Sequence, residues 1–243
     1  CARLWDCENL MKINRKHARQ RGFTLIELLM VVLLLSIVVG AIFSQIERAQ
    51  VRYRVEDQKV DLTQQEREFI DQFTRDLHQA GYPSVSMFGG QYTTSSNQVA
   101  GGVWSISATE LHMEGNVDGN GVQSIVYSYF DGAGWPGPGA NPCPCLRRSA
   151  IPKVDGVAPS AQAVGTAFTQ VQNVIPIATQ PIFAAFDATG SPIDLTATIT
   201  DPATLATIKS VQITVTTQGV VKDSDAHKDI QVSMTGMARL VNN

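Results

Sequence analysis

The chain has 243 residues, which is enough for one sizeable hydrophobic core or for two small domains. Its composition is ordinary for a folded protein and argues against global disorder. The net charge is −3, and residues 1–22 sum to about +4. The remaining residues therefore carry about −7, which argues against a broad nucleic-acid-binding surface.

The amino-terminal stretch is basic. Met11 is the first methionine, and five Lys and Arg residues follow it over residues 12–21. We interpret residues 1–10 as an upstream extension of the reading frame, so that Cys1 and Cys7 do not belong to the product. Residues 1–22 are then a basic leader peptide.

Residues 23–43 form an apolar run that contains one charge, Glu27. Its length is that of a helix that crosses a bilayer. The basic leader predicts a cytoplasmic start and export of everything after the run. A carboxylate at mid-membrane costs roughly 2.5–3.5 kcal/mol, and less near an edge, so Glu27 requires a functional explanation.

Three interpretations of this segment compete. A secretory signal peptide could be cut after the small residues at 39–41, but the apolar run is longer than a usual signal core and contains an acid. A plain signal anchor needs no glutamate. The third interpretation rests on the sequence RGFTLIE at residues 21–27.

This heptapeptide resembles the recognition site of type IV prepilins and of type II secretion pseudopilins. The resemblance implies that a prepilin peptidase cuts between Gly22 and Phe23 and methylates the new amino terminus at Phe23. Glu27 is then expected to neutralise the terminal amine of a neighbouring subunit, so that two costly charges become one pair that fixes the axial register. The implied partners are this peptidase and methyltransferase, other major and minor pilins, and an inner-membrane assembly platform; no cofactor is implied.

The helical pattern continues beyond the membrane segment. Residues 23–81 lack proline, and apolar residues between 51 and 80 recur at spacings of three, four and seven. One helix over about 23–80, roughly 85 Å at 1.5 Å per residue, is predicted, with Gly81 and Pro83 at its end. Residues 23–43 form its transmembrane half and 44–82 its amphipathic continuation. The phrase Arg-Asp-Leu followed by Ala-Gly-Tyr within residues 67–82 is similar to PilW-type minor pilins.

Residues 83–243 predict an exported, β-rich head. Short β-prone runs alternate with connectors rich in Gly, Pro, Ser and Asn. A hairpin turn is expected at residues 187–190 and a short helix at 203–208. The fold class is α+β, pilin-like, with a long amino-terminal helix packed on an antiparallel sheet. The predicted strands are residues 102–107, 109–113, 122–130, 181–186, 208–217 and 228–240.

Three long connectors, at about 87–102, 131–142 and 155–166, are either partner surfaces or flexible filler. Cys143 and Cys145 flank one proline on the exported side. They form a strained disulfide, remain free thiols, or link to another subunit. A zinc site is not expected, because no other ligand stands at suitable spacing.

Residues 114–121 place Asn116, Asp118 and Asn120 at alternate positions around glycines. The pattern partly resembles a calcium loop, but it lacks the closing glutamate. Because Asn, Asp and Gly also suit a hairpin turn, we favour the turn and keep calcium as a weak candidate.

None of the four histidines belongs to a nucleophile, base or metal motif, and no phosphate-binding loop is present, so an enzyme is not predicted. The expected function is that of a structural minor pilin of a type IV pilus. Its alternatives are a minor pseudopilin of a type II secretion system and a tip-displayed adhesin. The chain is expected to cross the inner membrane once, with a cytoplasmic amino terminus and a periplasmic head, before it enters a pilus at the cell surface.

Overall fold

The computed structural model describes residues 22–132, 144–177, 179–222 and 229–242. The chain divides into two compact units, residues 1–50 and residues 51–243. In the described part of the first unit, all residues from 25 to 50 lie in helix α1 (Leu25–Gln79) and are exposed. The predicted helix over 23–80 is confirmed to within two residues at each end.

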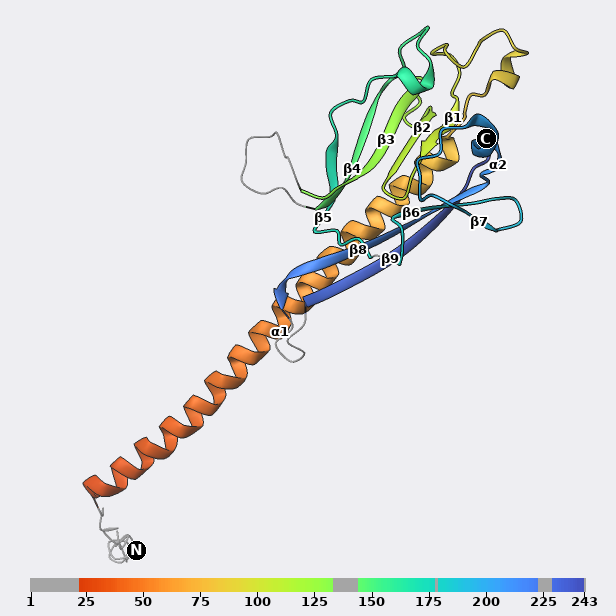
Figure 1. Ribbon diagram of the computed structural model, residues 1–243. Coiled ribbons are helices and arrows are strands. Elements are labelled where there is room, and N and C mark those ends of the chain that lie inside the picture. The colour runs from red at the N-terminus through yellow and green to blue at the C-terminus, as the bar shows by residue number, and fades with distance from the viewer. Residues whose placement is uncertain (1–21, 133–143, 178, 223–228, 243) are drawn as a thin grey trace, which may run out of the picture. The chain divides into compact units, whose positions relative to one another are not determined.

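The second unit packs the remainder of α1 against two antiparallel sheets (Figure 1). The helix presents to the sheets a stripe that contains Val55, Leu62, Phe69, Phe73 and Leu77. These positions follow the four- and seven-residue spacing of one helical face, which is why the sequence pattern predicted them. The α+β class, with a long helix on an antiparallel β head, is confirmed.

The first sheet has five strands in the order β1-β2-β3-β4-β5, so each strand pairs with its neighbour in sequence. Sequence reasoning found the first three strands and missed β4 and β5. Strand β4 carries two adjacent arginines and β5 is mostly polar, so neither shows the apolar run that marks a strand. The strands are β1 (Gly102–Ile106), β2 (Glu110–Gly115), β3 (Gln123–Phe130), β4 (Cys145–Pro152) and β5 (Phe168–Gln172).

The second sheet has four strands in the order β7-β6-β8-β9. The expectation of one sheet was therefore wrong, because strand positions along the chain do not reveal which strands pair. The predicted turn at residues 187–190 is confirmed: it joins β6 to β7, and Gly190 adopts a positive φ of 82° there. The strands are β6 (Phe183–Phe186), β7 (Pro192–Ile193), β8 (Ser210–Lys222) and β9 (Asp229–Arg239).

Three short helices complete the head. Helix α2 (Pro202–Thr207) begins one residue before the predicted start, and the Asp201 side chain caps it by accepting the backbone N–H of Thr204. Turns of 3-10 helix, η1 (Val85–Phe88) and η2 (Pro159–Ala161), lie in or beside two of the long connectors. The third connector, at 131–142, lies mostly outside the described residues.

The core lies where the helix meets both sheets. Phe73 packs edge-on against Tyr127 of β3 at a centroid distance of 5.2 Å and also contacts Phe183 of β6 at 5.8 Å. Phe69 contacts the same Tyr127 ring at 5.7 Å. Aromatic side chains of α1 therefore bind the two sheets into one core.

Candidate functional site: the amino-terminal segment and its attachment to the head

The predicted processing site lies immediately before α1. Phe23 is 78% exposed, and the helix begins two residues later, at Leu25. The Thr24 hydroxyl accepts the backbone N–H of Glu27 at 3.3 Å, and the Thr24 carbonyl accepts that of Leu28 at 3.2 Å. Thr24 therefore caps the helix, and Glu27 lies in the first turn, where the helix dipole favours an acid.

Nothing in the described chain requires glycine at position 22. A Cβ built on Gly22 meets no heavy atom within 4 Å, and its φ is not in the left-handed region. A side chain at this position would therefore fit the protein itself. If glycine is required here, the requirement comes from another molecule that binds the segment.

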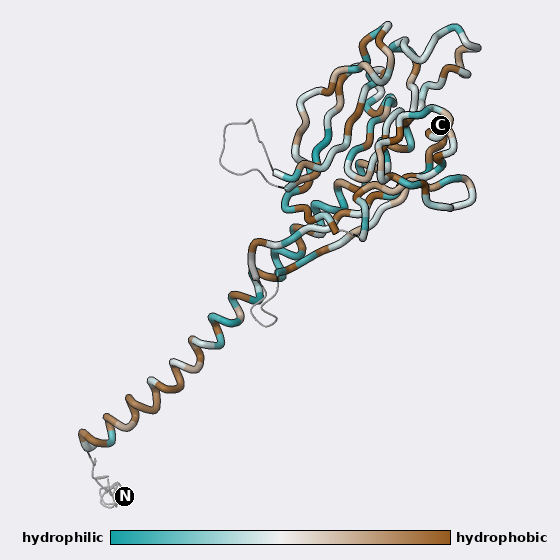
Figure 2. Tube along the Cα trace, viewed as in Figure 1, coloured by the Kyte–Doolittle hydropathy of each residue, from teal (hydrophilic) through white to brown (hydrophobic). Residues whose placement is uncertain are grey.

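The amino-terminal part of α1 consists mainly of hydrophobic residues (Figure 2), and their side chains are exposed. Within the described residues, α1 is the one helix long and apolar enough to cross a membrane. Leu33 and Leu34, for example, are more than half exposed. Such a surface is stable only when lipid or another apolar helix covers it.

The same segment matches a family model described as the prokaryotic N-terminal methylation motif, over residues 17–43. It is a type IV prepilin-type signal. The signal includes the last part of the basic leader, the Gly22–Phe23 bond, Glu27 and the apolar run. It supports membership of the type IV pilin or pseudopilin family, whose proteins are generally structural. A search of curated proteins and a search of solved structures each found no match.

Buried polar contacts join the part of α1 in the second unit to the two sheets. Asp76 is 5% exposed and accepts hydrogen bonds from Tyr127 Oη at 2.6 Å and from Arg148 Nε at 2.7 Å. Burial and the Asp76 carboxylate raise the pKa of Tyr127 well above its ordinary value, so the phenol remains a donor. Helix α1, β3 and β4 are thereby joined at one point.

A second carboxylate joins α1 to the other sheet. Glu66 is fully buried, and its Oε1 accepts the Thr217 hydroxyl of β8 at 2.8 Å. Within the described residues, its Oε2 has no hydrogen-bond partner. Burial raises the pKa of Glu66, because the loss of water disfavours the charged carboxylate, and the hydrogen bonds of Thr217 only partly oppose that shift.

The end of the helix meets β2 at very close range. The Gly81 N–H donates to the Glu114 carbonyl at 2.9 Å, and the Gly81 φ of 75° favours glycine. A Cβ on Gly115 would lie 2.5 Å from the Gln79 carbonyl oxygen, which leaves no room for a side chain. The Ala-Gly-Tyr phrase found in the sequence is thus the place where the helix terminates against the sheet.

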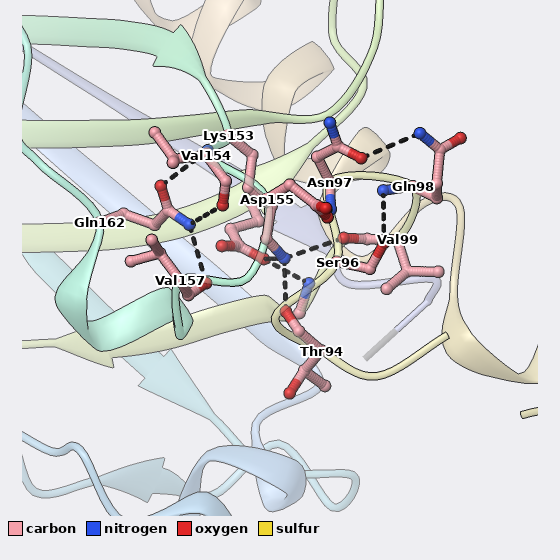
Figure 3. A network of polar contacts seen from close by, with 12 residues as sticks. Thr94, Ser96, Asn97, Gln98, Val99, Lys153, Val154, Asp155, Val157 and Gln162 are labelled. Carbon is pink, nitrogen blue, oxygen red and sulfur yellow. Dashed lines mark hydrogen bonds and ion pairs between the residues drawn. The ribbon is translucent and has the colours of Figure 1, made fainter. Parts of the chain in front are cut away.

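Lys153 lies directly after β4 and binds the connector at residues 87–102 (Figure 3). Its ammonium donates to the Thr94 carbonyl at 2.5 Å, the Val99 carbonyl at 2.9 Å and Glu114 Oε2 at 2.6 Å. Glu114 also accepts the Gly101 N–H at 2.8 Å. Burial raises the pKa of Glu114, and the hydrogen bond from Lys153 opposes that shift.

The connector after β4 is fixed by its own side chains. The Gln162 carboxamide donates to the carbonyls of Val154 and Val157 and accepts the N–H of Val154 (Figure 3). The Asp155 carboxylate accepts the N–H of Asn97 from the other connector at 2.9 Å. The two connectors are therefore hydrogen-bonded to each other, which argues against flexible filler.

The remaining predicted site residues lie far along the chain from the prepilin signal. Asn116 and Asp118 form the hairpin turn between β2 and β3, where their side chains accept the N–H groups of Gly121 and Asn120. No group of three or more His, Cys, Asp or Glu among the described residues suits a metal ion. The calcium hypothesis stays a prediction, and a millimolar calcium titration followed by thermal shift tests it.

Cys143 lies outside the described residues, so the proposed Cys143–Cys145 bridge also stays a prediction. The Cys145 thiol is buried and lies 3.8 Å from the Thr169 hydroxyl. Sequence reasoning missed the buried polar residues of the head, above all Glu66 and Lys153. Only Asp76 had a signal, through the phrase that ends the helix.

Proposed function

We propose that the chain is a minor pilin of a type IV pilus, processed by a prepilin peptidase and assembled through α1. The observation that carries the proposal is the prepilin-type signal at the start of a helix whose apolar side chains are exposed within the described residues. The remainder of that helix is built into a β-rich head. The similarity of residues 67–82 to PilW-type minor pilins favours the minor-pilin subtype.

Cleavage after Gly22 would place a new ammonium group at Phe23, one residue before the helix cap at Thr24. The helix dipole disfavours a cation at this end, and a bilayer or filament core disfavours it further. An acid from a neighbouring subunit relieves both costs. Glu27 is the one acid in the apolar run, so it is the residue that we assign to this pairing.

The same proposal places the chain in the inner membrane before assembly, with a cytoplasmic leader and a periplasmic head. The prepilin peptidase, other pilins and the inner-membrane assembly platform are its proposed partners. The role of the chain is structural, in pilus initiation or assembly. Transfer of the mature subunit to the filament would move the apolar surface from lipid to the packed helices of its neighbours.

Mass spectrometry of the mature amino terminus tests the processing step. We expect a chain that begins at N-methylated Phe23. Gly22→Ser should remain uncut without loss of stability, because the site has room for a side chain. A native protein that retains its leader, or that begins near Ile42, would refute the proposal.

Glu27→Gln tests the pairing step, and Glu47→Gln on the exposed part of the same helix is its matched control. We expect Glu27→Gln to insert into the membrane and to be cut normally, but to enter pili poorly. Glu47→Gln should assemble like the natural chain. Equal incorporation of both variants into pili would count against the assigned role of Glu27.

A further inference from the structure

The free edge of β9 differs from the other three sheet edges of the head. Strand β7 has two residues and contains Pro192, and β5 has five residues with an irregular register against β4. The edge of β1 is bonded to Ile199 in both directions, at 3.1 and 2.8 Å. Short length, proline, irregularity and coverage are devices that block unwanted strand pairing.

From Gln231 to Arg239, strand β9 has none of these devices, and its one register shift lies before Gln231. It has 11 residues, lacks proline and lysine, and pairs with β8 in unbroken register from Gln231 to Arg239. In the described part of the chain, the backbone hydrogen bonds given for residues 231–239 go to β8, and none goes to the other side of the strand. Met237, on the solvent face, is 56% exposed.

The direction of the backbone groups follows from one hydrogen bond. The Leu240 N–H donates to the Lys209 carbonyl on the β8 side, at 2.9 Å. The N–H and C=O groups of successive residues in a strand point to opposite sides. Those of the even-numbered residues of β9 therefore point toward β8, and those of the odd-numbered residues point away from it. The outward N–H and C=O groups belong to Gln231, Ser233, Thr235, Met237 and Arg239.

We propose that this edge receives an extended strand of a different polypeptide, added antiparallel to β9. The unpaired row of backbone donors and acceptors specifies a strand, because no other element can bond to all of them. Antiparallel addition matches every pairing in the head. The added strand should be uncharged in its middle and acidic at its amino-terminal end, which faces Arg239.

A second copy of this chain does not suit the edge. Two β9 strands in parallel would oppose Arg239 to Arg239, which is unfavourable. For an antiparallel pair of β9 strands, the orientation of the two heads decides whether two copies of the chain can pair. Gly219 lies between Gln58 and Ile230, and Gly236 lies against Ile70, so β9 runs in the same direction as α1.

Two heads joined by antiparallel β9 strands would therefore have residue 51, where α1 enters each head, at opposite ends of the pair. That arrangement does not suit two chains anchored in one membrane, a step that rests on the proposed function. The occupant is accordingly a strand from another protein. Its backbone supplies the affinity, and its charged end sets the direction.

The test uses the full chain in detergent and two synthetic peptides. The first peptide has the sequence of residues 210–218, which already pairs with β9 on its other side, with a glutamate added at the amino terminus. In the second peptide, lysine replaces that glutamate. Hydrogen exchange at single-residue resolution reports which amides are protected, and fluorescence polarisation reports affinity.

We expect the first peptide to protect the amides of the odd-numbered residues of β9, and to bind more tightly than the lysine peptide. Met237→Pro removes one outward N–H and should weaken binding about fivefold to tenfold, the effect of one hydrogen bond. Met237→Ala keeps that N–H and should bind within about twofold of the natural chain. Gln212→Lys, on the same sheet face but within β8, should also have no effect.

Absence of protection at saturating peptide, or equal binding by Met237→Pro with an unchanged melting temperature, would overturn the proposal. Self-association of the chain that Met237→Pro abolishes would also overturn it, because the occupant would be a second copy. Gln231→Pro repeats the test at the other end of the strand if Met237→Pro does not fold. These measurements do not depend on cleavage at Gly22, so failure of the proposed function is seen separately.

Discussion

Removal of the Lys153 ammonium should destabilise the head strongly. The group is fully buried, as is Glu114, and they form an ion pair at 2.6 Å. Lys153→Met keeps most of the side-chain volume and deletes the charge. It leaves the Glu114 carboxylate without a cation and the carbonyls of Thr94 and Val99 without their donor.

The expected loss of stability follows from the Glu114 carboxylate, which remains buried after Lys153 is replaced. Breaking a buried ion pair on one side costs about 3–5 kcal/mol, because an uncompensated charge stays in the interior. The single hydrogen bond from the Gly101 N–H to Glu114 offsets only part of this cost. We therefore expect Lys153→Met to lower the free energy of unfolding by about 3 kcal/mol or more at neutral pH.

The assay is urea denaturation of the full chain in detergent, followed by near-ultraviolet circular dichroism at pH 8 and at pH 5. The pKa of Glu114 is already raised by burial, and loss of Lys153 raises it further. A raised carboxyl pKa gives stability that is present at low pH and is lost as the pH rises through it. Lys153→Met should therefore be less damaging at pH 5 than at pH 8.

The double variant Lys153→Met with Glu114→Gln provides the control. It removes both charges, so it should be more stable at pH 8 than Lys153→Met alone, by about 1–3 kcal/mol. A loss below about 1 kcal/mol for the single variant, or no recovery in the double variant, would refute the reasoning.

Three further predictions concern the contact of α1 with the head. Glu66→Gln should stabilise the head relative to the natural chain more at pH 8 than at pH 5. The reason is that the raised pKa of Glu66 makes its ionisation destabilising, and urea midpoints of both proteins at the two pH values measure the difference. Asp76→Asn should cost about 2–3 kcal/mol, since the Arg148 guanidinium loses its carboxylate, and a thermal melt near the natural midpoint would contradict it. Gly115→Ala should cost about 1–3 kcal/mol by pressing its methyl on the Gln79 carbonyl, whereas an unchanged melt would show that the helix end can shift.

Local sequence patterns were sufficient to predict most helices and strands, but they were insufficient to predict which strands pair. The uninterrupted helical periodicity predicted α1 to within two residues at each end, because side-chain spacing on a helix is a local property. The alternation around Ile213 predicted β8 in the same way. Strand β4 was missed because its charged residues are typical of a loop. One of them, Arg148, points inward and bonds to Asp76, which lies 72 residues away in sequence.

The sequence by itself determined the amino-terminal site. The proposed cleavage site, the acid and the apolar run lie within 27 consecutive residues, so they can be recognised without knowledge of the fold. The tertiary structure decided that there are two sheets rather than one, that Lys153 binds the connector at residues 87–102, and that β9 forms a long strand at the edge of its sheet. These features depend on which distant residues become neighbours, and the free energy of such contacts exists only once the chain has folded.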